Sequence, residues 1–168
     1  MAAPASLASR IEVRVLPFRH AATVRRTVAS SAMTGEILRG LDLVETAIGM
    51  QGLAPVGPPF VRLHRLGGEL DLEIGIPLAQ PIEPDGDVRP SSLPGGPAVH
   101  VLRLGDMAGA RTHRALAAYL VRNGLTQAGS PWECLLGDPE RVPDLAAWQT
   151  DLYVPVAPGH ARPAGSCG

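Results

Sequence analysis

The sequence contains no lysine, so all 15 of its fixed positive charges are arginines. They are balanced by 16 acidic residues, which gives a formal net charge of −1. The arginines are scattered along the chain and form no basic run. Because binding to nucleic acid through phosphates needs a concentrated stripe of positive charge, we expect no direct contact with nucleic acid.

Long apolar runs are also absent. Residues 1–9 have neither the basic start nor the apolar segment of a signal peptide, and no stretch approaches the roughly 20 apolar residues that cross a bilayer. We therefore expect a cytoplasmic protein with no membrane partner. Only two cysteines are present, Cys134 and Cys167. The second lies in a tail rich in Gly, Pro and Ala, so we expect reduced thiols rather than a disulfide.

What the chain does have is enough apolar material for one core, with 168 residues of which 45% are hydrophobic. That size predicts one domain. We expect it to span residues 10–156, in two halves at 10–79 and 97–156. The compositions of residues 1–9 and 157–168 are typical of disordered tails outside the packed fold.

The two halves repeat one another. Gly52, Gly57 and Phe60 are matched by Gly124, Gly129 and Trp132 at a constant separation. Apolar spacing predicts helices at 33–51 and 107–123, each closed by a Gly-Leu pair typical of a helix C-cap. Each helix precedes a predicted hairpin, at 59–66 with 69–78 and at 131–136 with 149–156, where Gly67-Gly68 suits the first turn.

One more alternating strand is expected before each helix, at 11–15 and at 99–101, with a further strand-like stretch at 23–28. Residues 80–97 are interpreted as a polar linker. The fold class predicted from these elements is α+β. It is a tandem, pseudo-symmetric βαββ repeat with an antiparallel sheet, two helices and a ligand cleft between the halves.

Motifs of one kind follow one another in order along roughly residues 10–156. They are Gly57-Pro58-Pro59-Phe60, the strand Asp71–Leu78, Leu93-Pro94-Gly95-Gly96, Gly105, Pro131-Trp132-Glu133, Asp138-Pro139 and the closing strand Thr150–Val156. This ordered set resembles the GyrI-like family, the effector-binding domains found alone and in multidrug-responsive transcription regulators, and we interpret the chain as a stand-alone member.

The resemblance implies a cleft for lipophilic, often cationic, aromatic compounds, and it places the family's pocket glutamate on Glu133. The sequence departs from the family at several pocket positions. Tyrosines usual in the family are replaced by Leu63 and Leu135, and the usual His and Tyr around the glycine after the fourth strand fall on Arg103 and Met107. Aliphatic and thioether walls therefore replace aromatic ones.

Glu133 also stands out within the sequence itself, because the repeat matches it with apolar Val61. A charge that breaks internal symmetry indicates function. Strand alternation places Glu133 and Leu135 on one face and Trp132 and Cys134 on the other. We expect Glu133 to bind a ligand with a delocalised cation, which is cheaper to desolvate than a compact one. The alternative is an ion pair with Arg62 or Arg103.

Other candidates complete the expected ligand site. Glu73 and Tyr153 occupy equivalent places in the two halves and are expected in the same cleft, although Glu73 could equally be solvent-facing strand polarity. Trp148 either caps the cleft or anchors its loop. Met107 offers an adaptable wall of the kind that promiscuous binders use.

We predict no metal, no cofactor and no nucleotide site, because the five histidines lack metal spacing and the Gly-rich stretches do not open helices. The first functional hypothesis is a module that senses or sequesters multidrug-type compounds, as a monomer or a homodimer. The alternative is a hydrolase of cyclopropane-bearing genotoxins that uses Glu133, with Glu73 as a partner acid. The loss of pocket tyrosines favours the binding module.

Overall fold

The computed structural model describes residues 11–65, 68–104, 110–137 and 148–158. Met107 and almost all of the two expected tails lie outside these residues. The packed chain continues slightly past the predicted end of the domain, because the Ala157 N–H donates to the Thr126 carbonyl at 2.8 Å.

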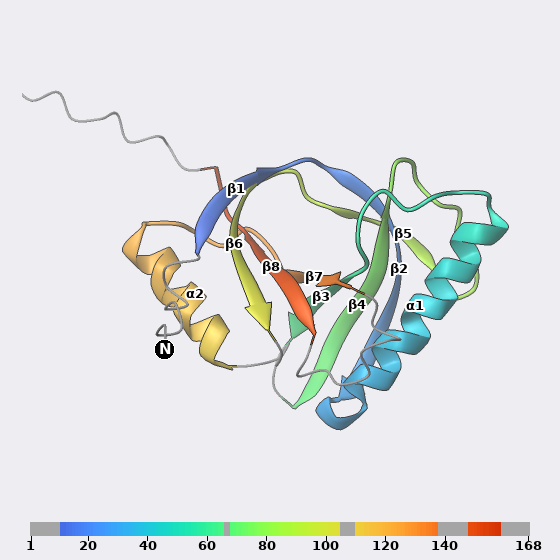
Figure 1. The fold of residues 1–168 in the computed structure, drawn as a ribbon, viewed down its shortest axis with the longest axis horizontal. Coiled ribbons are helices and arrows are strands. Elements are labelled where there is room, and N and C mark those ends of the chain that lie inside the picture. The colour runs from blue at the N-terminus through green and yellow to red at the C-terminus, as the bar shows by residue number, and fades with distance from the viewer. Residues whose placement is uncertain (1–10, 66–67, 105–109, 138–147, 159–168) are drawn as a thin grey trace, which may run out of the picture.

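Eight strands form one antiparallel sheet in the order β1-β6-β8-β7-β3-β4-β2-β5. The sheet is strongly curled, and a helix flanks it on each side (Figure 1). These elements confirm the predicted α+β class with an antiparallel sheet and two helices. The strands are β1 (Glu12–Leu16), β2 (Arg19–Ala29), β3 (Phe60–Arg65), β4 (Glu69–Leu78), β5 (Arg89–Leu93), β6 (Gly96–Leu104), β7 (Trp132–Leu136) and β8 (Gln149–Pro155).

The helices α1 (Met33–Met50) and α2 (Ala110–Arg122) lie where apolar spacing predicts them. Both end in the same way. Gly52 and Gly124 have φ angles of 65° and 62°, the left-handed region that favours glycine. The N–H of the following leucine then donates back to the helix, Leu53 to Ile48 and Leu125 to Leu120, at 3.1 Å and 2.9 Å. Each Gly-Leu pair is therefore a C-cap.

Two of the predicted strand assignments are wrong. The strand that precedes α1 and pairs with β4 is β2, whereas β1 crosses over the molecule to the second half and pairs with β6 (Figure 1). Apolar alternation is present in both stretches, and it does not reveal which partner each one takes. The expected linker also contains a strand, β5, on the edge of the sheet. Pro90 is tolerated there because an edge strand has one unpaired side.

The sheet has two buried faces. On one face α1 packs against β2, β3 and β4 through a large apolar cluster, and α2 packs against β6 and β8 through a smaller one. A third cluster lies on the opposite face, around Phe60 and Trp132. Neither helix, within the described ranges, is long and apolar enough to cross a membrane.

Candidate functional site

Glu133 lies on the helix-side face of the sheet, at the seam between the two helix-side clusters. It is directly opposite Val61 of β3 on one side and Leu152 of β8 on the other. Val61 belongs to the cluster under α1, and Leu152 belongs to the cluster under α2. The carboxyl group is therefore introduced into an otherwise apolar surface, at the middle of the molecule.

The Glu133 carboxylate is completely buried, with 0% of the residue exposed. The Thr150 hydroxyl of β8 donates a hydrogen bond to Oε2 at 2.7 Å. The guanidinium of Arg103 in β6 approaches the same oxygen, with Nη2 at 3.2 Å. Sequence reasoning left open a ligand carboxylate without a partner or an ion pair with a nearby arginine, and the structure contains the pair with Arg103.

Arg103 itself is almost fully buried, with 4% of the residue exposed. Its Nε has no hydrogen-bond partner among the residues that the structure describes. A buried guanidinium with unused donors is costly, because each donor has lost its water without a replacement. The Arg103–Glu133 pair is thus held mainly by charge, and its hydrogen bonding is incomplete on the arginine side.

Leu63, Leu135 and Trp148 join Val61 in the cluster under α1, so the structure brings these four predicted residues to the face that bears Glu133. Trp148 has only 6% of its surface exposed and packs with Leu135 in that cluster. The Glu133 carboxylate is therefore closed off from solvent by the residues around it.

The strand alternation predicted for β7 is confirmed. Trp132 and Cys134 lie on the opposite face, in the cluster around Phe60. Burial, together with the charge of Asp151, raises the pKa of the Cys134 thiol to about 12. A thiol that stays protonated is a poor nucleophile, so this surrounding disfavours Cys134 as a nucleophile at neutral pH.

The expectation that Glu73 and Tyr153 share the cleft of Glu133 is wrong. Residues directly opposite each other on neighbouring strands share a face of the sheet. Glu73 and Tyr153 are linked by a row of such pairs, which runs from Glu73 to Arg62, from Arg62 to Trp132 and from Trp132 to Tyr153. Glu133 follows Trp132 in the strand, so it points to the other face. Glu73 therefore cannot act as the acid partner of Glu133, and the hydrolase alternative is left with Glu133 alone.

Tyr153 stacks on Trp132 with ring centroids 5.5 Å apart and lines a small cavity of about 240 Å³ with Trp132 and Cys134. Its pKa is raised, mainly by burial. Whichever ligand binds here would be separated from Glu133 by the thickness of the sheet.

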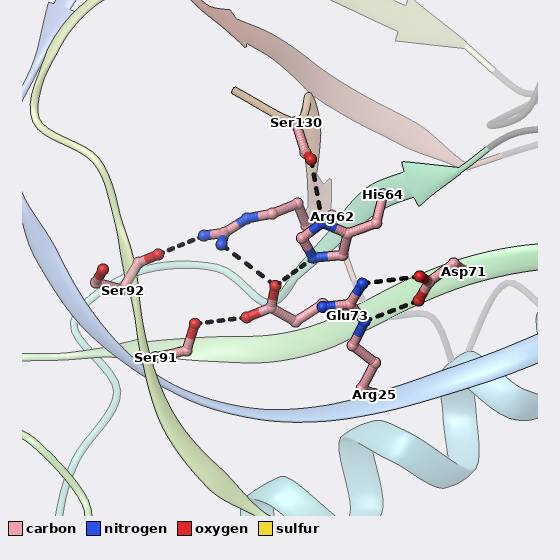
Figure 2. Close-up of polar contacts among 8 residues, drawn as sticks. All are labelled: Arg25, Arg62, His64, Asp71, Glu73, Ser91, Ser92 and Ser130. Carbon is pink, nitrogen blue, oxygen red and sulfur yellow. Dashed lines mark hydrogen bonds and ion pairs between the residues drawn. The ribbon is translucent and has the colours of Figure 1, made fainter. Parts of the chain in front are cut away.

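Glu73 is the centre of a polar network on this opposite face (Figure 2). Ser91 donates to its Oε1 at 2.5 Å, and Arg62 Nη1 and His64 Nε2 lie 3.2 Å and 2.7 Å from its Oε2. Burial alone would raise the pKa of Glu73, but the bond from Ser91, the charge of Arg62 and the bond from His64 outweigh it, so that its pKa lies below the ordinary value. Glu73 is an ionised, fully partnered carboxylate.

Sequence reasoning missed three members of this network, namely His64, Ser91 and Ser130. His64 did alternate with Arg62 along a predicted strand, which places both on one face. Ser91 and Ser130 gave no signal, because they come from segments interpreted as a linker and a loop, and only the curl of the sheet brings them to His64 and Glu73.

The protein is an eight-stranded α+β domain with a buried carboxylate between two helix-packed halves. No family model matches the sequence, and no curated protein matches it significantly. Solved structures do match. The EcmrR C-terminal domain superposes with a TM-score of 0.72 at 19% identity, over 89% of this chain and 98% of that one. EcmrR in its DNA complex within EcmrR-RPo gives 0.73 at 18% identity, and this chain spans 58% of its length.

Two further structures have the same fold. A hydrolase from Listeria innocua gives a TM-score of 0.57 at 16% identity, over 88% of this chain and 92% of that one. SAV2435 bound to tetraphenylphosphonium gives 0.57 at 13% identity, over 88% and 93%. These neighbours confirm the fold that the GyrI-like resemblance predicts.

Proposed function

We propose that this chain binds small lipophilic molecules on the helix-side face of its sheet, with cationic aromatic compounds as preferred ligands of Glu133. The observation that carries the proposal is the position of the carboxylate. A fully buried Glu133 lies on an apolar surface between two helix-packed clusters, and its cationic partner Arg103 is incompletely hydrogen-bonded. The binding of tetraphenylphosphonium by SAV2435, which has the same fold, supports the choice of ligand.

The electrostatics of the pair favour exchange of one cation for another. A delocalised cation is weakly hydrated, so moving it from water to this site costs less than moving a compact ammonium. On entering, it takes the place of the Arg103 guanidinium near Oε2 and releases an arginine whose Nε lacks a protein partner in the described structure. The Glu133 carboxylate stays charge-compensated throughout.

The buried site of Glu133 opens most easily by a movement of α2. Of the described side chains of α2, only Thr112 and Leu116 are buried, whereas α1 buries seven residues along its length. Less apolar area buried means less free energy lost when the element moves, at roughly 25 cal/mol per Å². A lipophilic ligand would then replace the apolar contacts that α2 gives up.

The first test compares two ions of the same shape and opposite charge, tetraphenylphosphonium and tetraphenylborate. We expect the wild-type chain to bind tetraphenylphosphonium with micromolar affinity, roughly −8 kcal/mol, and tetraphenylborate more weakly. Glu133→Gln removes the charge and keeps the volume. It should weaken tetraphenylphosphonium about tenfold or more and abolish the preference between the ions.

Stability must be measured on the same variant. Glu133→Gln leaves the buried Arg103 without its counter-charge, so we expect a loss of about 3 kcal/mol in the free energy of unfolding. A destabilised variant that still binds tetraphenylphosphonium with wild-type affinity would show that Glu133 is only a structural partner of Arg103. Equal binding of both ions by the wild-type chain would contradict the preference for cations.

A further inference from the structure

The network on the opposite face contains a serine, a histidine and a carboxylate in line (Figure 2). The hydroxyl oxygen of Ser130 is 3.1 Å from His64 Nδ1. The other ring nitrogen, Nε2, is 2.7 Å from Glu73 Oε2. Both distances are within the reach that a nucleophile and its general base require. The three residues come from separate segments, the loop before β7, the strand β3 and the strand β4.

The partners determine how protons are arranged in this line. Glu73 is ionised and can only accept hydrogen bonds, so an imidazole of His64 that carries one proton carries it on Nε2 and donates it to Glu73. Nδ1 then has a free lone pair, and it accepts the Ser130 O–H. This tautomer is the one that a base needs in order to take a proton from Ser130.

The carboxylate that orients His64 is itself held from two sides. Arg62 Nη1 and the Ser91 hydroxyl bind Glu73, and Arg62 also donates to the Ser92 carbonyl across the curl of the sheet. Glu73 is therefore unable to rotate away from His64 without breaking several charge-assisted bonds. A fixed orienting group is the third part of a hydrolytic triad.

The line ends at a cavity. Ser130 is half-buried, and together with His64 and Arg62 it lines a cavity of about 670 Å³. The remaining walls include Pro94, Pro97, Pro155 and Val156. A volume of this size accepts a small organic molecule, and apolar proline walls suit a short acyl chain.

We propose that Ser130, His64 and Glu73 form a hydrolytic triad that cleaves small carboxylic esters with a short apolar acyl group. The Ser130 oxygen bonds to the ester carbonyl carbon while its proton passes to His64 Nδ1. The bond to the alcohol oxygen then breaks, and the alcohol leaves with that proton. Water repeats the sequence on the acyl-serine and releases the carboxylic acid, so no group is oxidised or reduced. The positive charge of Arg62, at the cavity wall, favours the oxyanion that develops at the carbonyl.

The test uses p-nitrophenyl acetate with the purified full chain. We expect catalytic release of p-nitrophenol, and a fall of at least about a hundredfold for Ser130→Ala and for His64→Gln. Ser31→Ala, which removes an exposed hydroxyl before α1, is the matched control and should keep the wild-type rate. Circular dichroism of each variant shows whether it is folded.

A covalent readout keeps the proposal testable even if a variant fails to fold. A fluorophosphonate probe should label the wild-type chain at Ser130, as located by peptide mass spectrometry. Labelling at another residue, absence of labelling, or an undiminished rate in folded Ser130→Ala would overturn the proposal. Because Ser130 and Glu133 lie on opposite faces, these outcomes are independent of whether tetraphenylphosphonium binds.

Discussion

At the scale of single residues, the two buried glutamates illustrate different solutions to the same problem. Glu73 is surrounded by donors, so its charge is stabilised by Arg62, His64 and Ser91. Glu133 shares one oxygen between Thr150 and an arginine that is itself incompletely bonded. A well-partnered carboxylate suits a fixed role such as orienting a histidine, whereas an incompletely bonded pair can be exchanged for a ligand.

The lowered pKa of Glu73 predicts a pH-dependent contribution to stability. Its pKa in the folded chain lies below 4.5, so the contribution is fully present above that pH and is lost as pH falls through the lower folded value. Glu73→Gln should cost on the order of 3 kcal/mol at neutral pH, since it leaves Arg62 without its counter-charge. We expect this difference from wild type to shrink at an acidic pH below the lowered folded pKa of Glu73, where Glu73 itself becomes protonated.

Urea unfolding of both chains at the two pH values measures the difference directly. A difference that is constant, or that grows on acidification, would mean that Glu73 is not stabilised as an anion in the folded chain.

At the scale of elements, the two helices occupy equivalent positions in the order of elements along the chain, but they bury different amounts of apolar surface. Both follow a strand, end in a Gly-Leu cap and lead to a hairpin. However, α1 buries Met33, Ile37, Leu41, Val44 and Ile48, while α2 buries Leu116 as its one fully buried apolar side chain among those described. Val121 of α2 is 81% exposed. The site of Glu133 is thus bounded by one firmly packed helix and one loosely packed helix.

This asymmetry predicts a difference in local opening. Amides of α2 should exchange their hydrogens at least about tenfold faster than amides of α1, because opening α2 exposes less apolar surface. Saturating tetraphenylphosphonium should slow exchange in α2 and leave α1 nearly unchanged. Hydrogen-exchange mass spectrometry of the free and bound chain measures both. Equal exchange in the two helices, or protection confined to α1, would contradict opening at α2.

At the scale of the whole molecule, local sequence patterns were sufficient for the helices, their caps and the hairpins, since these depend on neighbouring residues. They did not predict that β1 pairs with β6 of the second half, because Val13 and Val15 show the same alternation whichever strand they pair with. The sequence placed Glu133 on the correct face of its strand. It did not predict whether Glu73 lies on the same face of the sheet as Glu133, because that depends on the register in which β4 pairs with β3 and β3 pairs with β7.

The same register places the two candidate sites on opposite faces of the sheet. The helix-side face bears the Arg103–Glu133 pair between two apolar clusters, and the other face bears the network of Glu73, His64 and Ser130 beside its own cavity. The sheet that carries both sites ends in the strand pair β1 and β6 on one edge and in the pair β2 and β5 on the other. The two proposed activities can therefore be tested separately, because their residues lie on different faces of one sheet.

The affinity of Arg103→Met for tetraphenylphosphonium measures directly whether a ligand cation takes the place of the Arg103 guanidinium. Methionine keeps an unbranched apolar chain in place of Arg103 and removes the charge that lies 3.2 Å from Glu133 Oε2. If the ligand takes the place of this guanidinium, removing it should raise the affinity about tenfold, because no internal cation has to be displaced. Arg62→Met, which removes a buried arginine from the opposite face, should leave the affinity unchanged. Unchanged or weaker binding by Arg103→Met would contradict the account.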